Sequence, residues 1–265
     1  MNVLVYFSFV EDMDRLTDSE WHALLEEDNT YPIKHRVSMC GESGLEQALR
    51  LKQSAEREIH LQAVTMISKE SNELELFAQK VQALQFKLAF LINSEDNCFT
   101  DVYKAEYLRD FVEKQSLSYQ AYIFEYEDER TGFSLIPAYL SEFWQIPLIE
   151  NVNEIVCLEE TVAEVIVNKS DGTDTLRVAL PAIFSIGASS VSKLRMPSMK
   201  DKLKTRNQQP ERIVFNNQSK EAGPVPSLKK LEKDSFSERD CRLLVDEEDQ
   251  RMADELLSLL RGEGT

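Results

Sequence analysis

Glycine is scarce in this sequence of 265 residues: there are 8 glycines, and none lies before Gly41. Average proteins contain roughly 7% glycine, so a chain of this length would ordinarily have about twice as many. The first apolar segment therefore cannot lead into a glycine-rich phosphate loop of the G-x-G-x-x-G or P-loop kind. This absence excludes the two commonest nucleotide-binding signatures from the N-terminal region.

Cysteine, histidine and basic residues are also few. The 4 cysteines form no C-x-x-C pair and the 3 histidines are scattered, so the sequence predicts reduced thiols and has no metal-ligand spacing. The net charge is -17, from 30 basic and 47 acidic residues, which argues against nucleic acid as a partner. No signal-peptide pattern and no apolar run of roughly 18 residues are found, so we expect a cytoplasmic protein with no membrane span.

Four short apolar segments are typical of buried parallel strands because they are rich in β-branched and aromatic residues. They lie at 3–10, 61–67, 88–92 and 119–124. Segments with helical spacing of apolar residues separate them, and the first of these contains a capping box at 43–46. This alternation predicts an α/β fold with a doubly wound, mostly parallel sheet.

Consecutive strands are predicted after Pro147, at 152–155, 162–167 and 176–186. We expect these strands to form an antiparallel addition to the sheet. The α/β domain is therefore expected to cover residues 1–187.

The remaining sequence is predicted to leave the domain. Residues 188–245 contain several prolines and no core pattern, and are expected to form an extended arm. A C-terminal helix is predicted within 246–265. Its apolar side chains share one face, which we expect to dock on another chain: Met252, Leu256, Leu259 and Leu260.

Two polar segments follow the strand at 119–124, at the sheet edge where open α/β folds bind ligands. Residues 125–129 are acidic, and either a metal or general-acid role or a solvated loop would account for them. Residues 131–134 are predicted to open the fourth helix. Their hydroxyls, on Thr131 and Ser134, would either add donors to a phosphate site or cap the helix.

A concentrated basic patch lies in the predicted arm. It consists of Lys193, Arg195, Lys200, Lys202, Lys204 and Arg206. It would meet phosphates or an acidic partner surface, or it would be a solvated face of the arm. No G-x-S-x-G motif and no cysteine in a reactive context are found, so we expect no enzymatic activity of the chain alone.

Four segments of the sequence resemble the electron transfer flavoprotein β subunit family. Residues 44–52 (Gly-Leu-Glu-Gln-Ala-Leu-Arg-Leu-Lys) are similar to the family's Ala-Leu-Glu-Glu-Ala-Leu-Arg-Leu-Lys helix. Residues 140–147 resemble its Leu-Ala-Glu-x-Leu-Gly-Ile-Pro segment. Residues 180–182 and 195–199 resemble its Leu-Pro-Ala and Pro-Arg-Tyr-Pro-Ser-Leu segments, and these blocks agree in order across 1–215.

The resemblance implies a fold like that of the adenine nucleotide alpha hydrolases and a role in electron transfer. Family members pair with an α subunit that carries a redox-active FAD, and the β subunit holds AMP or a second FAD. The C-terminal arm and helix embrace the α subunit. A homodimer is the alternative expected if the α subunit is absent.

The resemblance also implies a nucleotide site with altered residues. The cleft would be lined by Phe9, Ser38, Thr65, Met66, Arg130, Thr131, Gly132 and Ser134. Arg130 stands where the family has a nucleotide-contacting aspartate, and Leu135 where it has a glutamine. Each lost hydrogen bond is worth about 0.5–1.5 kcal/mol, so we expect AMP or FAD to bind weakly or not at all. The alternative is a non-redox binding or scaffold protein that kept the fold and lost the nucleotide.

Overall fold

The computed structural model of this chain describes residues 1–26, 33–67, 71–93, 100–115, 117–128, 132–187 and 193–215, together with Ala253 and Leu257. The chain divides into two units, Met1–Lys229 and Lys230–Thr265. In the second unit, Ala253 and Leu257 are helical. The other residues of the predicted C-terminal helix, and most of the predicted arm, lie outside the described residues.

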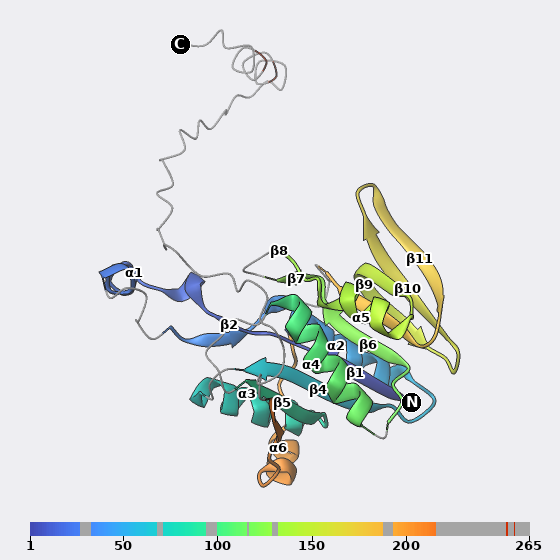
Figure 1. Cartoon of the computed structure of the whole chain (residues 1–265), viewed down its shortest axis with the longest axis horizontal. Helices are drawn as coiled ribbons and strands as arrows, with labels where there is room; N and C mark the ends of the chain where they lie inside the picture. Colours follow the sequence, from blue (N-terminus) through green and yellow to red (C-terminus); the bar gives the residue numbers. More distant parts are fainter. Residues whose placement is uncertain are drawn as a thin grey trace. The chain divides into compact units, whose positions relative to one another are not determined.

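A mixed sheet of nine strands runs through the first unit (Figure 1). From one edge to the other the strands are β11 (Gly172–Ala179), β10 (Val162–Lys169), β9 (Leu148–Leu158), β12 (Ala182–Ile186), β6 (Ala121–Glu125), β1 (Asn2–Tyr6), β4 (His60–Ile67), β5 (Lys87–Asn93) and β13 (Glu211–Phe215). Every pair from β9 to β13 is parallel, whereas β10 is antiparallel to both of its neighbours. Two short antiparallel pairs lie outside this sheet: β2 (Phe9–Glu11) with β3 (His35–Val37), and β7 (Glu127–Asp128) with β8 (Gly132–Phe133).

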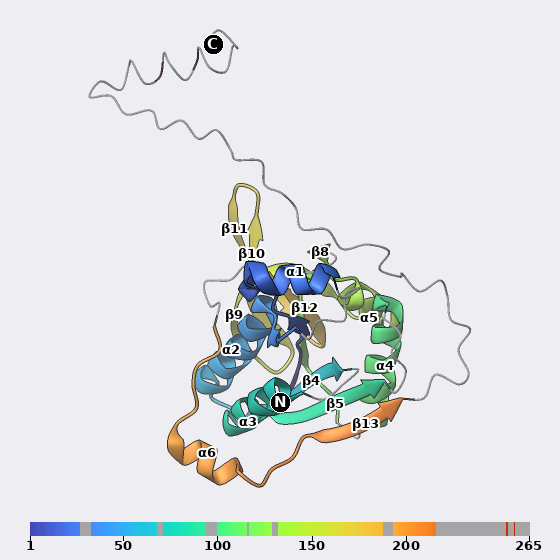
Figure 2. The same cartoon turned by 90° about the vertical axis from the view of Figure 1, so that its left-hand side faces the viewer.

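The helices of the first unit are α1 (Asp18–Glu26), α2 (Met39–Ser54), α3 (Asn72–Ala83), α4 (Asp101–Lys114), α5 (Ile136–Trp144) and α6 (Met199–Thr205), with a short 3-10 turn at Met13–Arg15. Of these, α2 and α3 cover one face of the sheet, and α4 and α5 cover the other (Figure 2). Val3 and Val5 of β1 pack in one apolar cluster with residues of α2 and α3. Leu4 and Tyr6 pack in a second cluster with residues of α4 and α5, because successive strand residues face opposite sides.

The order of the strands places a switch point beside β1. The chain first adds β4 and β5 on one side of β1, and then returns through α4 to place β6 on the other side. The prediction of an α/β fold with a doubly wound, mostly parallel sheet is confirmed at this level. Ligands of such sheets bind outside the carboxyl ends of the strands at the switch point. A ligand site is therefore expected at the carboxyl ends of β1 and β6.

Two strand predictions were wrong at their ends. The segment 3–10 is not one strand: β1 ends at Tyr6, and Phe9 begins β2, which pairs with β3. The segment 176–186 is likewise divided at Pro181, which has no N–H to donate to a ladder. Its second half, β12, does not belong to the antiparallel addition but inserts between β9 and β6 in the parallel part of the sheet.

Residues 193–215, which the sequence assigned to the extended arm, contain α6 and β13. Strand β13 pairs with β5 at the edge of the sheet, and its Phe215 is buried against Tyr107 with ring centroids 4.6 Å apart. One buried side chain in a five-residue strand leaves little periodic signal, which is why the pattern alone missed it. Within the ranges described, no helix is both long and apolar enough to cross a membrane.

Candidate functional site at the switch point

The switch point is filled by the side chain of Glu125, the last residue of β6. Its Oε1 accepts a hydrogen bond from the Ser8 N–H at 2.8 Å, and its Oε2 accepts one from the Ser8 hydroxyl at 2.5 Å. The Ser38 hydroxyl also donates to Oε1. Glu125 is only 3% exposed, so the cluster of Ser8, Ser38 and Glu125 forms a buried polar knot between the carboxyl ends of β1 and β6 and the start of α2.

Ser38 connects this knot to the first turn of α2. It is the N-cap residue, and its Oγ accepts the Gly41 N–H at 2.9 Å. An N-cap hydroxyl satisfies one of the unpaired N–H groups at a helix start, and the helix dipole favours a negative charge there. The Glu125 carboxylate supplies this charge. The chain's own side chain therefore stands where an anionic ligand of α2 would otherwise bind.

Gly41 lets the three elements approach one another. A Cβ at this position would lie 2.6 Å from Glu125 Oε1, 2.7 Å from Ser38 Oγ and 2.9 Å from Phe7 Cβ. Real Cβ atoms do not make contacts this short, so any larger residue would displace the carboxylate or the helix. Because Gly41 has no side chain, the Glu125 carboxylate has room at the start of α2, in the place that a ligand phosphate would otherwise take.

A second carboxylate occupies the start of α5. The Leu135 N–H, at the N-cap of α5, donates to Asp101 Oδ2 at 2.8 Å, and Asp101 also lies 3.4 Å from Lys104 Nζ. The prediction that residues 131–134 open this helix was wrong, because Gly132 and Phe133 form β8 and the helix begins at Ile136. Pro137 fits the first turn, where its missing N–H costs nothing.

The residues expected to line a nucleotide cleft do not all meet. Ser38 lies in the buried knot, and the Phe9 ring stacks on His35 with centroids 5.7 Å apart. Thr65 and Met66 are successive residues of β4 and so face opposite sides of the sheet, Met66 being packed with the α4 and α5 cluster. The Thr65 hydroxyl is buried and has no hydrogen-bond partner among the described residues.

The remaining cleft residues lie in or beside the hairpin of β7 and β8. Gly132 is exposed and has φ of 90°, and the Ser134 N–H donates to the Tyr126 carbonyl at 3.1 Å. Arg130 and Thr131 lie outside the described residues. The sequence analysis missed Ser8, because a single serine inside an apolar segment carries no pattern of its own.

The acidic segment 125–129 divides into residues with different surroundings. Glu125 is buried and hydrogen-bonded, whereas Glu127 is exposed in β7. Within the part of the chain that the structure describes, no group of three or more His, Cys, Asp or Glu side chains is arranged to hold a metal ion. The geometry of Glu125 is that of a structural acceptor for hydrogen bonds.

Arg195 of the predicted basic patch is held by a buried carboxylate. Its Nε lies 2.9 Å from Glu46 Oε1 and 3.0 Å from Oε2, and its N–H donates to Oε2 at 3.1 Å. Burial by itself would raise the pKa of Glu46, but the hydrogen bonds and charge of Arg195, with the charge of Arg50, outweigh it and lower the pKa. The same pair raises the pKa of Arg195. Arg195 is therefore a structural anchor.

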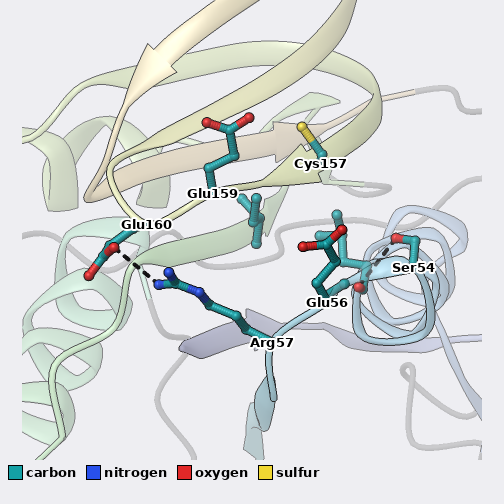
Figure 3. Close-up of a pocket in the computed structure, with 9 residues that line it drawn as sticks. Ser54, Glu56, Arg57, Cys157, Glu159 and Glu160 are labelled. Atoms are coloured by element: carbon teal, nitrogen blue, oxygen red, sulfur yellow. Dashed lines mark hydrogen bonds and ion pairs between the residues drawn. The ribbon is translucent and has the colours of Figure 1, made fainter.

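A separate cavity of about 470 Å³ lies at the opposite end of α2 from the knot (Figure 3). It is lined by Leu51, Ser54, Ala55, Glu56, Arg57, Cys157, Leu158, Glu159 and Glu160. Figure 3 shows Arg57 reaching toward Glu160, to which it is paired at 3.1 Å. These ionic side chains are exposed, and no nucleophile and base are paired in the cavity, so it does not form a catalytic arrangement.

No protein-family model and no curated protein matches this chain.

Proposed function

We propose that this chain is an electron transfer flavoprotein β-like subunit that pairs with an α-like subunit, has no catalytic set of its own, and carries a degenerate AMP or FAD site. The segments that resemble the family support this proposal by their positions. Residues 44–52 lie within α2, 140–147 run from α5 to the start of β9, and 180–182 form the turn into β12. A fold like that of the adenine nucleotide alpha hydrolases belongs to the same proposal.

The observation that carries the proposal of a degenerate site is the Glu125 carboxylate at the start of α2. A phosphate bound at that helix start would face a buried negative charge. Two unit charges 4 Å apart repel by about 4 kcal/mol at an effective dielectric constant of about 20. That energy corresponds to a roughly thousandfold loss of affinity, so an adenine nucleotide would bind weakly even if its base and ribose fitted.

The Asp101 carboxylate acts in the same direction at the second helix start. The Leu135 N–H already donates to the Asp101 carboxylate, so α5 has no unpaired N–H at this position for a phosphate. The starts of α2 and α5 therefore each have a carboxylate of the chain itself beside them. This supports a subunit whose role is to position a partner's flavin and not to hold a nucleotide tightly.

A non-redox scaffold protein is the second candidate, because internal carboxylates would equally serve a fold that has lost its ligand. The two candidates differ in the partner. A redox subunit would form a complex with an α-like subunit and alter the properties of the α flavin. A scaffold protein would bind its partner without any flavin in the complex.

The test is to purify the chain alone and after co-expression with an α-like subunit from the same genome. We expect the chain alone to be colourless and free of extractable AMP. We expect the complex to be a heterodimer with a single flavin, measured by visible absorption and by chromatography of the released nucleotide. Near-stoichiometric flavin on the chain alone would contradict the degenerate site, and failure to form a flavin-containing complex would favour the scaffold.

A further inference from the structure

A strongly basic surface with exposed apolar side chains lies around α6, far in sequence from the buried knot. Three large apolar residues are mostly exposed there: Met196 at 70%, Met199 at 72% and Leu203 at 67%. Met199 and Leu203 are one helical turn apart and share a face of α6. We call residues 193–206 the α6 surface. In Figures 1 and 2, α6 lies beside α3 and projects from the sheet.

The exposure of these side chains is fixed by buried neighbours. Leu194 is buried in the core, and Arg195 is clamped by Glu46. Pro197 is also buried, and Ser198 caps α6 by accepting the Asp201 N–H at 3.2 Å. The chain is therefore anchored on both sides of Met196, and the anchoring directs this side chain outward.

Five cations surround the exposed apolar residues: Lys193, Lys200, Lys202, Lys204 and Arg206. All five are exposed, and none of them forms an ion pair within the described ranges. The one acid of the surface, Asp201, accepts the Ser198 hydroxyl. A local excess of positive charge in a chain of net charge -17 indicates an anionic partner.

The composition of the α6 surface favours one class of anionic partner. Protein interfaces are enriched in aromatic residues, methionine and arginine and depleted in lysine. The α6 surface has no aromatic residue, and four of its five exposed cations are lysines. The excess of lysine over arginine, beside an exposed leucine, is instead typical of surfaces that lie on anionic bilayers, where the ammonium groups reach the headgroups and the apolar side chains enter the interface.

We propose that the α6 surface binds the anionic headgroup surface of a lipid bilayer peripherally. Each lysine or arginine near such a surface contributes roughly a fivefold increase in partition. Charges beyond about 8 Å are screened at physiological salt, and on α3, which packs against α6, the acid Glu75 is paired with Arg212 at 2.7 Å. The proposal goes beyond the proposed function and does not depend on the α-like subunit.

The experiment is co-sedimentation of the full chain with phosphatidylcholine vesicles that contain or lack phosphatidylserine. We expect binding to the phosphatidylserine vesicles alone, and loss of that binding as salt is raised. The variant Lys200→Glu/Lys202→Glu/Lys204→Glu should reduce partition by at least about a hundredfold, since three fivefold attractions are removed and the three new carboxylates are repelled by the anionic surface. The variant Met199→Ser/Leu203→Ser should reduce it by about tenfold, because both apolar insertions are lost.

The matched control changes three exposed lysines outside the α6 surface, as Lys34→Glu/Lys114→Glu/Lys169→Glu. It alters the net charge of the chain by the same amount, and we expect it to reduce partition by no more than about twofold. Thermal unfolding of each variant confirms that it folds. Equal binding to both kinds of vesicle, no binding by the native chain, or equal loss in the control would each overturn the proposal. Capture of an acidic protein through the same lysines, without vesicle binding, would also overturn it.

Discussion

The Glu125 carboxylate accepts both donors of Ser8, the N–H at 2.8 Å and the hydroxyl at 2.5 Å, although the two residues are 117 positions apart. This contact joins the carboxyl ends of β6 and β1 at the point where the strand order of the sheet reverses. The Ser8 N–H, two residues beyond the end of β1, is thus bound to a side chain and is not open to a ligand. The Glu125 side chain therefore occupies the switch point of the sheet.

Replacing this carboxylate by an amide should destabilise the protein strongly. In Glu125→Gln the side chain keeps its size but loses its charge, and an amide N–H₂ group would face the Ser8 or Ser38 donors. Hydrogen bonds to charged groups are worth about 1.5–3 kcal/mol each, so we expect a loss of about 3 kcal/mol in the free energy of unfolding. Urea unfolding followed by circular dichroism measures it. The control, Glu127→Gln, is exposed and should change stability by less than about 0.5 kcal/mol.

The pair of Glu46 and Arg195 should make stability depend on pH in acid. The pKa of Glu46 is lowered from its ordinary value of 4.5 in the folded chain. Its contribution is therefore fully present above pH 4.5 and is lost as the pH falls through the lowered folded value. We expect Glu46→Gln to cost about 2 kcal/mol at neutral pH, and the difference from the native chain to shrink as unfolding is measured at pH values falling below 4.5.

Glu42→Gln is the matched control, since Glu42 lies in the same helix and pairs with Lys80 at 3.4 Å. This pair is partly exposed, so its loss should cost about 0.5 kcal/mol. Equal costs for the two substitutions, or a difference for Glu46→Gln that does not vary with acid pH, would show that the Arg195 anchor contributes nothing specific.

Two buried tyrosines should destabilise the protein in alkali. Burial raises the pKa of Tyr119 and of Tyr122 from 10.0 to about 12. Because the folded values lie above the unfolded ones, their contribution is fully present below pH 10 and is lost as the pH rises from 10 to about 12. Absorbance at 295 nm during alkaline titration should show a late-titrating component, which each of Tyr119→Phe and Tyr122→Phe reduces.

Tyr119→Phe should also stabilise the protein at neutral pH. The Tyr119 hydroxyl is buried and has no hydrogen-bond partner among the described residues. Removing a buried unpaired hydroxyl removes its desolvation penalty, and we expect a gain of about 1 kcal/mol in the free energy of unfolding. A loss of that size in urea unfolding would mean that the hydroxyl has a partner.

The two glycines of α2 should respond differently to alanine. A Cβ on Gly41 would lie within 3 Å of Glu125, Ser38 and Phe7, so Gly41→Ala should cost about 3 kcal/mol and disrupt the knot. A Cβ on Gly44 would meet Ile123 Cγ2 at 3.1 Å. The better helix propensity of alanine, about 1 kcal/mol, should offset much of that strain. Urea unfolding of both variants checks this, and equal costs would contradict the close approach at Gly41.

The sequence by itself determined the central layers of the fold. The apolar segments that became β4, β5 and β6, and the helical spacing of α2 to α5, are local patterns, because burial on one side of a strand or helix repeats every few residues. The ends of elements were less certain. The chain leaves β1 after Tyr6, and Ser8 then binds the Glu125 side chain from β6, a contact that no pattern within 3–10 records.

Only the tertiary structure decided what lies at the switch point. Glu125 stands in an acidic segment that could equally have been a solvated loop, and its burial depends on Ser8 and Ser38, which are distant in sequence. The clamp of Arg195 on Glu46 spans 149 positions, and β13 becomes a strand because β5 offers it an open edge. Hydrophobic periodicity is a property of neighbouring residues in the sequence, so it can be recognised before the fold is known. The partner of a buried charge or of an edge strand is a residue distant in sequence, and only the folded chain brings the two together.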